Sequence, residues 1–379
     1  MTGKERHTAT RAAGGTCPDR VGGLRQRLRA RSVGACRSRR PTCRQSYFIS
    51  LAVAGAALAI TGGCAVVNEY RANWHVDRGE ALLAAQDLEA ALAEFDAAAR
   101  LTPQMAVAHS RMGVIYRRMG EYERAMDSFV QAIHCDPFSF DDTFNLAQLY
   151  HFMNRITEAI QAYLHAVQLD PADFDAQINL GVCYQQTGDF DQAVKRFHKA
   201  IDIDPNRPHA YVNVGVALDA QKRYYEAIHA YKEALERDSH QPLVLVNLAH
   251  TYLNQDRLKM GRRALEQAIR MDPQLAAAHE ALGYCLFRMR DFEGAELSYK
   301  HALAYDWRLP RSLAALGSVN MLRFLKDDSL VDRRDRALEY WHRSLELDPN
   351  QPRIRKLIAQ YKPKPSDPEQ ALLDHRSTP

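Results

Sequence analysis

Asparagine recurs every 34 residues at one position in four successive stretches of the chain: Asn145, Asn179, Asn213 and Asn247. An asparagine amide carries hydrogen-bond donors and an acceptor, so one side chain can pair with both the N–H and the C=O groups of an extended peptide. A row of such amides would hold a peptide backbone with little demand on the peptide's sequence. The pattern therefore predicts binding rather than catalysis.

Apolar residues flank this row of amides. The residues that directly precede the asparagines are Phe144, Ile178, Val212 and Val246, and those one helical turn beyond them are Gln148, Val182, Val216 and His250. We expect the apolar members to take up side chains of the bound peptide. In the alternative interpretation, each asparagine only bridges two neighbouring helices of the protein.

The amides belong to a longer repeated pattern. In the stretch 174–205 it consists of Leu180, Gly181, Tyr184, Gly188, Ala193, Phe197, Ala200 and Pro205, and related stretches begin at Ala72, Ala106, Phe140, Pro208, Pro242, Ala276 and Pro310. A fixed period of this length is typical of stacked supersecondary units. Small residues at Gly181 and Ala193 would let two helices approach closely, and Gly188 suits a turn with positive φ.

These residues resemble the tetratricopeptide repeat family over about 280 of the 379 residues. The resemblance implies an all-α, right-handed superhelical solenoid of about eight helix-turn-helix repeats over residues 72–350, closed by a capping helix over 351–361. The eighth repeat has eight extra residues, which we expect in the turn between its helices, near residues 325–329.

In this family the first helix of each repeat lines a concave groove. The resemblance therefore implies a peptide-binding groove formed by Phe144, Asn145, Ile178, Asn179, Val182, Val212, Asn213, Val216, Val246 and Asn247. Apolar residues such as Phe144, Ile178 and Val182 replace the polar set of the family's two-carboxylate clamp, so we do not expect a chaperone-tail clamp. Arg111, Arg117 and Arg118 lie near the same face, where they would contact an acidic partner segment or remain solvated.

The row of amides is similar to the one in the repeats of O-GlcNAc transferase, although no transferase domain follows the repeats here. We expect a protein–protein interaction scaffold that binds extended peptide segments. The alternative is a substrate-recruiting module of a separate glycosyltransferase, and a third hypothesis is self-association through the ends of the stack.

The sequence contains no motif for a catalytic or cofactor site. There is no GxxxxGK[ST], HExxH or GxSxG, and the seven cysteines show no CxxC spacing. The aspartates before each terminal proline, Asp170, Asp204, Asp238 and Asp272, are expected to form turns and caps. We therefore predict no enzyme activity, no cofactor and no metal.

Charge divides the chain unevenly. Residues 1–46 contain eleven arginines and Lys4 against Glu5 and Asp19, which gives +10 and leaves −6 for the remainder of a chain with net charge +4. The mildly acidic body does not indicate nucleic-acid binding. We interpret residues 1–46 as a disordered basic leader and residues 362–379, which hold four prolines, as a flexible tail.

Residues 47–67 form an uncharged run that predicts a signal sequence or a membrane anchor. Its segment 60–64 resembles a bacterial lipobox, with Thr61 where leucine is usual, which implies lipidation of Cys64. An uncleaved signal anchor is the alternative. Either prediction, for a bacterial cell, places the repeats on the extracytoplasmic, periplasmic side. Because the 46-residue lead is long, we expect the true start to be internal, at Val33 or Leu24.

Overall fold

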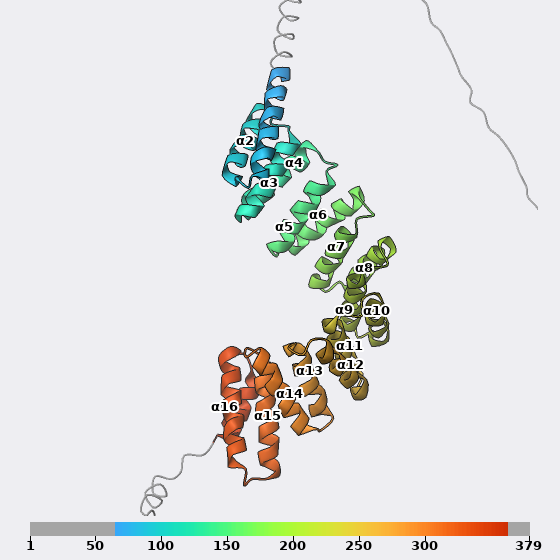
Figure 1. The fold of residues 1–379 in the computed structure, drawn as a ribbon, viewed down its shortest axis with the longest axis vertical. Coiled ribbons are helices and arrows are strands. Elements are labelled where there is room, and N and C mark those ends of the chain that lie inside the picture. Colours follow the sequence, from blue (N-terminus) through green and yellow to red (C-terminus); the bar gives the residue numbers. More distant parts are fainter. Residues whose placement is uncertain (1–64, 363–379) are drawn as a thin grey trace, which may run out of the picture. The chain divides into compact units, whose positions relative to one another are not determined.

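The computed structural model describes residues 65–362, and this part of the chain consists of helices joined by short turns, with no strand (Figure 1). A helix over residues 65–84 comes first. The others are α2 (Leu88–Leu101), α3 (Ala106–Met119), α4 (Tyr122–Cys135), α5 (Phe140–Phe152), α6 (Ile156–Leu169), α7 (Phe174–Thr187), α8 (Phe190–Ile203), α9 (Pro208–Ala220), α10 (Tyr224–Arg237), α11 (Pro242–Asn254), α12 (Leu258–Met271), α13 (Ala276–Arg288), α14 (Phe292–Tyr305), α15 (Pro310–Lys326), α16 (Val331–Leu347) and α17 (Pro352–Tyr361). The predicted all-α fold of paired helices is confirmed.

In six of the eight repeats, an aromatic ring of the second helix covers a glycine of the first. A Cβ added to Gly181 on α7 would lie 2.5 Å from a ring carbon of Phe197 on α8. A Cβ added to Gly215 would lie at the same distance from a ring carbon of Tyr231. Phe197 itself is fully buried. The glycine therefore sets how closely the two helices of a repeat approach, as the repeated pattern predicts.

In seven of the eight repeats, the turn between the two helices contains one residue in the left-handed region. Gly188 has φ 82° and Gly120 has φ 79°, as glycine permits. In five other repeats the same turn position holds a non-glycine residue with φ between 59° and 64°, namely Gln86, Asn154, Lys222, Asp256 and Arg290. The repeat geometry thus imposes this conformation even where the side chain disfavours it.

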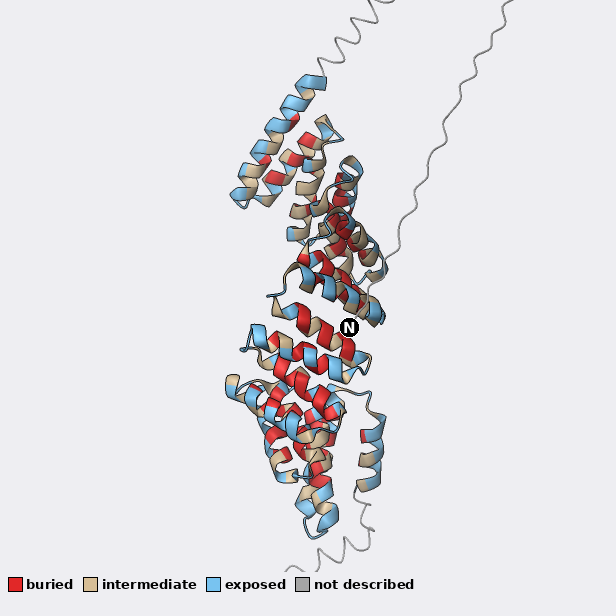
Figure 2. Cartoon of the chain, turned by 90° about the vertical axis from the view of Figure 1, so that its right-hand side faces the viewer, coloured by how far each residue is buried: buried red, intermediate tan, exposed pale blue. Residues whose placement is uncertain are grey.

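Successive repeats are joined by aspartate-stabilised turns. The Asp204 carboxylate accepts a hydrogen bond of 3.0 Å from the backbone N–H of Asn206, and Asp170, Asp238 and Asp272 make the same contact in their repeats. These turns place α7, α9, α11, α13 and α15 so that each approaches the next directly. Buried residues accordingly recur from one repeat to the next rather than in one central core (Figure 2).

The extra residues of the eighth repeat lie mainly in helices, which corrects the prediction of a longer turn. Helices α15 and α16 each contain 17 residues, compared with 13 in α13 and 14 in α14. The loop 327–330 is only one residue longer than its counterpart 289–291. A helical extension satisfies the backbone groups of the insertion internally, whereas an eight-residue loop would leave them to solvent.

Both ends of the repeat region differ in detail from the sequence pattern. The first helix extends back to residue 65, seven residues before the predicted start of the repeats at Ala72, which is buried in it. At the other end, α17 packs Ile354 and Ile358 against the buried Trp341, as expected of a capping helix.

Residues 1–64 and 363–379 lie outside the described part of the chain. The basic leader, most of the uncharged run, Cys64 and the tail from residue 363 therefore remain predictions. Among the helices of the described residues, none combines the length and apolar character that a bilayer-spanning segment requires.

Candidate peptide-binding groove

The predicted binding residues lie on the first helices of four successive repeats. Phe144 and Asn145 are on α5, and the remaining residues are on α7 (Ile178, Asn179, Val182), α9 (Val212, Asn213, Val216) and α11 (Val246, Asn247). Because α7, α9 and α11 approach one another directly, equivalent positions on these helices follow one another across the repeats. We call the four asparagines the amide row: Asn145, Asn179, Asn213 and Asn247.

Burial separates the flanking apolar residues into two groups. Ile178 and Val246 are only 8% and 5% exposed and belong to the core between repeats. They are therefore not available to a partner side chain, contrary to the prediction. Val182, Val212 and Val216 are half-buried, and so is Phe144, whose ring lies 5.5 Å from that of Phe140 and 5.8 Å from that of Tyr163.

The four amides differ in their hydrogen bonding. Arg117 donates to Asn145 Oδ1 over 2.9 Å and to Gln148 Oε1 over 3.2 Å, so the first amide is held from the preceding repeat. Over residues 65–362, the half-buried side chains of Asn179, Asn213 and Asn247 form no hydrogen bond to the protein. Bridging between helices accounts for Asn145 and leaves the other three amides free to bind a ligand.

The three predicted arginines have separate surroundings. Arg111 pairs with Glu80 of the preceding repeat, and Arg117 is engaged by the amides described above. Arg118 is exposed. Contact of these arginines with an acidic partner segment stays a prediction, and Arg111 and Arg117 would have to share their guanidinium groups with the protein partners that they already have.

Beyond the amide row, the equivalent positions of the next two repeats are occupied by Ala281 and Ala315. Both alanines line a cavity of about 410 Å³ formed by residues of α11, α13, α14 and α15. Its other lining residues are His250, Ala277, Glu280, Tyr284, Tyr299 and Arg311. The groove thus changes from a row of amides to a hollow with aromatic and charged walls.

A second cavity continues from the first and shares Tyr284, Tyr299 and Ala315 with it. This cavity of about 500 Å³ is lined mainly by apolar side chains of α13, α15, α16 and α17, including Phe287, Met321, Trp341, Leu357 and Tyr361. Both cavities are within the size range of ligand pockets in proteins. We call the two cavities together the C-terminal hollow.

Glu280 is the acidic residue of the C-terminal hollow. Burial raises the pKa of its carboxyl group above the ordinary value, and the nearby Arg311 guanidinium opposes that rise. The site therefore offers one cation and one carboxyl group of reduced acidity next to aromatic rings. Such walls suit a bulky side chain with a polar end.

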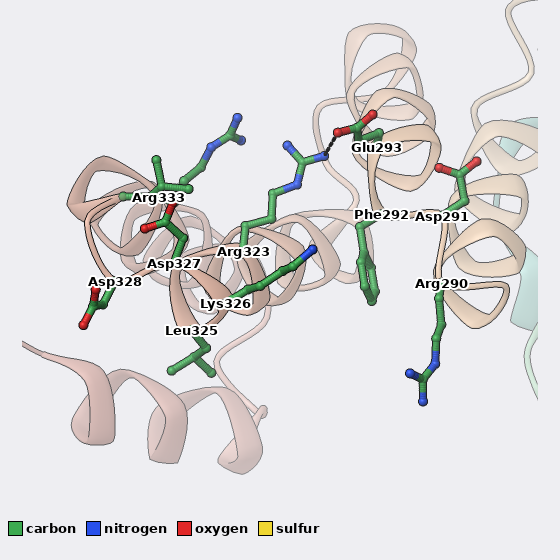
Figure 3. Close-up of a pocket in the computed structure, with 11 residues that line it drawn as sticks. Arg290, Asp291, Phe292, Glu293, Arg323, Leu325, Lys326, Asp327, Asp328 and Arg333 are labelled. Carbon is green, nitrogen blue, oxygen red and sulfur yellow. Dashed lines mark ion pairs between the residues drawn. The ribbon is translucent and has the colours of Figure 1, made fainter.

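A further cavity lies beside the lengthened helices of the eighth repeat. It measures about 1070 Å³, and Figure 3 shows that Arg323 points toward Glu293 there, at 3.7 Å. Its lining residues include Arg290, Asp291, Lys326, Asp327 and Arg333, and positive and negative charges are balanced among them. This balance gives no preference for an anion or a cation.

The described residues contain no group of histidine, cysteine, aspartate or glutamate side chains arranged to hold a metal ion. Cys183 and Cys285 are fully buried, and burial raises the pKa of both thiols. A raised pKa disfavours the nucleophilic thiolate, so these cysteines fit the predicted role of small core side chains.

Comparison with protein families agrees with this architecture. The profile "Tetratricopeptide repeat" matches residues 76–140, and the profile of the C-terminal domain of cilia and flagella-associated protein 70 matches residues 142–312. The chain is a tetratricopeptide-repeat protein. Both profiles describe repeat domains, and neither is a catalytic family. No curated protein sequence matches the chain at a significant level.

Solved structures share the fold of this tetratricopeptide-repeat protein. The C-terminal part of a repeat-containing protein from Cytophaga hutchinsonii matches with a TM-score of 0.54 and 19% identity, over 64% of this chain and 99% of that chain. Cut9 with Hcn1 from the APC/C matches with a TM-score of 0.51 and 16% identity, over 73% and 53%. YrrB, described as a repeat protein with an unusual peptide-binding site, matches with a TM-score of 0.43 and 24% identity, over 45% and 88%.

The sequence pattern missed the C-terminal hollow of this tetratricopeptide-repeat protein. The signal was nevertheless present, because Ala281 and Ala315 follow Asn247 at the same 34-residue interval. Small residues at a position that carries amides elsewhere indicate an opening, but the size of the opening depends on packing. Glu280 and Arg311 occupy apolar or variable repeat positions and carried no separate signal.

Proposed function

We propose that this tetratricopeptide-repeat protein is an interaction scaffold that binds an extended segment of a partner protein along its first helices. The observation that carries the proposal is the set of three consecutive half-buried amides, Asn179, Asn213 and Asn247, whose side chains have no partner within residues 65–362. Half-buried amides of this kind can exchange their hydrogen bonds to water for bonds to a peptide backbone.

The amide row and the C-terminal hollow would act on different parts of the partner. The amides bind backbone groups and therefore tolerate many sequences. The hollow provides about 410 Å³ and 500 Å³ of space beside Tyr284 and Tyr299, so it would select a partner with a bulky side chain at that point. Affinity and selectivity would thus come from neighbouring repeats.

We further propose that the chain is held at a membrane by its N-terminal segment, with the repeats on the extracytoplasmic side of a bacterial cell. The support is the uncharged run 47–67 and the basic leader 1–46 that precedes it. Lipidation of Cys64 and an uncleaved signal anchor are the two alternative attachments. Loss of labelled palmitate incorporation in Cys64→Ser would support lipidation, and persistent labelling would place the lipid elsewhere.

The alternative role as a recruiting module of a separate glycosyltransferase rests on the amide row alone. It predicts the same groove but a specific partner, so transferase activity would co-purify with the full-length chain. Copurification of other proteins without that activity would favour the general scaffold.

Site-specific photo-crosslinking tests the groove. A photoreactive phenylalanine analogue replaces Val182 or Val216 in the full-length chain inside the producing cell, and mass spectrometry identifies the adducts. Lys199, which is exposed on the second helix α8, is the control position. We expect adducts at the two first-helix positions, Val182 and Val216. The double replacement of Asn179 and Asn213 by alanine should abolish these adducts without changing the helix content.

Asn206→Ala serves as the matched control substitution, because Asn206 is exposed in a turn between repeats. Adducts of equal yield at Lys199, or adducts that survive the double replacement, would show that the first-helix face is not the binding surface.

A further inference from the structure

The first helix of the described chain, residues 65–84, carries an apolar stripe that the protein leaves uncovered. The stripe consists of Val66, Val67, Tyr70 and Trp74, which are 65%, 51%, 76% and 50% exposed. The spacing of three and four residues places these side chains on one side of the helix. The opposite side packs Ala72, Val76 and Gly79 into the first repeat.

We infer that this stripe lies against the surface of a lipid bilayer, in the headgroup layer. The inference rests on the proposed membrane attachment and adds to it the residues that contact lipid. Val66 and Val67 are the last residues of the uncharged run 47–67, and Cys64 directly precedes the described helix. Whether Cys64 is lipidated or the run is an uncleaved anchor, the helix begins at the bilayer.

The length of the stripe fits the thickness of the interface. At a rise of about 1.5 Å per residue, Trp74 lies about 10 Å along the helix from Val67. Each headgroup layer adds roughly 5–8 Å to the hydrocarbon core, so a helix tilted by about 40–60° from the bilayer normal keeps both aromatic rings within it. Tyrosine and tryptophan are the residues enriched at that depth, because they combine an apolar ring with a polar group.

Two arginines lie beside the stripe. The Arg78 guanidinium lies 5.3 Å from the centre of the Trp74 ring and pairs with Glu94 over 3.1 Å, while Arg71 is exposed. Lipid phosphates would accept hydrogen bonds from both arginines.

Depth-dependent fluorescence quenching tests the inference on the full-length chain in vesicles of phosphatidylethanolamine and phosphatidylglycerol. Flotation of the vesicles first reports attachment. Subtracting the emission spectrum of Trp74→Phe from that of the natural chain gives the emission of Trp74. Lipids that are brominated near the headgroup end of the acyl chain serve as the quencher. Trp307, 60% exposed in a turn far along the chain, gives the control difference through Trp307→Phe.

We expect the Trp74 component to shift to shorter wavelength and lose most of its intensity in brominated vesicles, while the Trp307 component stays unchanged. A chain that floats with an unquenched Trp74 component would overturn this inference and leave the attachment intact. A chain that does not float would overturn both. A blue shift without lipid that grows with protein concentration would assign the stripe to a second copy instead.

Discussion

Arg117 donates a hydrogen bond of 2.9 Å to Asn145 Oδ1 across the boundary between the second and third repeats. The bond uses one of the two lone pairs of Asn145 Oδ1, so the first amide offers a ligand its N–H groups and a reduced acceptor capacity. Asn179 and Asn213 retain both donor and acceptor. The four chemically identical side chains of the amide row therefore have unequal binding capacity.

Alanine substitutions should reveal this inequality. We expect Asn179→Ala to weaken partner binding by about 1–3 kcal/mol, because two hydrogen bonds worth roughly 0.5–1.5 kcal/mol each are lost. Asn145→Ala should cost about half as much. Titration of the partner identified by crosslinking measures both. Equal losses would indicate that the amides do not bind the backbone through donor and acceptor together.

The contact between Gly181 and Phe197 predicts a specific cost for an added methyl group. Gly181→Ala would place a Cβ 2.5 Å from the Phe197 ring and should destabilise the protein by about 1–3 kcal/mol through overpacking. Phe197→Leu should partly restore stability in the double variant. The sixth repeat already uses this combination, with buried Ala249 and Leu265 at the corresponding positions.

Guanidinium denaturation monitored by circular dichroism measures these variants. Gly188→Ala is the control, because no atom lies within 4 Å of its added Cβ and its cost would come only from the positive φ of 82°. Phe197→Leu should therefore not rescue Gly188→Ala. Rescue of both glycine variants, or of neither, would show that the Gly181–Phe197 contact does not limit the approach of the helices.

The fold was predictable because each element of the pattern has a local physical reason. Helices α3, α5, α7, α9, α11, α13 and α15 begin at Ala106, Phe140, Phe174, Pro208, Pro242, Ala276 and Pro310, the residues at which the sequence pattern starts. Turn geometry and proline fix these starts within a few residues of chain. Stacking of the repeats then places the same pair of helices again and again along the chain.

The site was less predictable because groove and core share the same helices. Ile178 and Asn179 are adjacent in sequence, yet only the amide remains available to a ligand. Similarly, Arg117 reaches an amide 28 residues away, a contact that depends on the packing between repeats. Whether a residue faces the groove or the core depends on the direction of its side chain, which a 34-residue period does not specify.

Thiol reactivity should follow burial in the described repeats. Burial raises the pKa of Cys183 to about 11 and also raises the pKa of Cys285, and both side chains are fully buried. We expect both to resist N-ethylmaleimide in the native chain at pH 8, while half-buried Cys135 reacts faster. Peptide mapping measures the order, and the chain unfolded in guanidinium should show equal rates. Early labelling of Cys183 would contradict its place in the core.

The buried carboxylate of Glu296 should stabilise the lengthened eighth repeat. It pairs with Lys300 over 2.7 Å, Arg323 over 2.9 Å and Arg333 over 3.1 Å, and the two arginines come from the added turns of α15 and α16. Burial opposes ionisation, but these three cations outweigh it and hold the pKa of Glu296 below the ordinary 4.5. We expect Glu296→Gln to destabilise the chain by about 2–4 kcal/mol at neutral pH.

The pH dependence of that loss distinguishes ion pairing from packing. Because the folded-state pKa is lowered, the stabilisation is fully present above pH 4.5 and is lost as pH falls through the folded pKa. The difference between the natural chain and Glu296→Gln should therefore shrink in acid, in parallel with faster hydrogen exchange over residues 323–334. Glu293→Gln is the matched control, because Glu293 is 92% exposed and its ion pair with Arg323 is long, at 3.7 Å. A pH-independent difference, or an equal effect of Glu293→Gln, would assign the role of Glu296 to side-chain volume rather than charge.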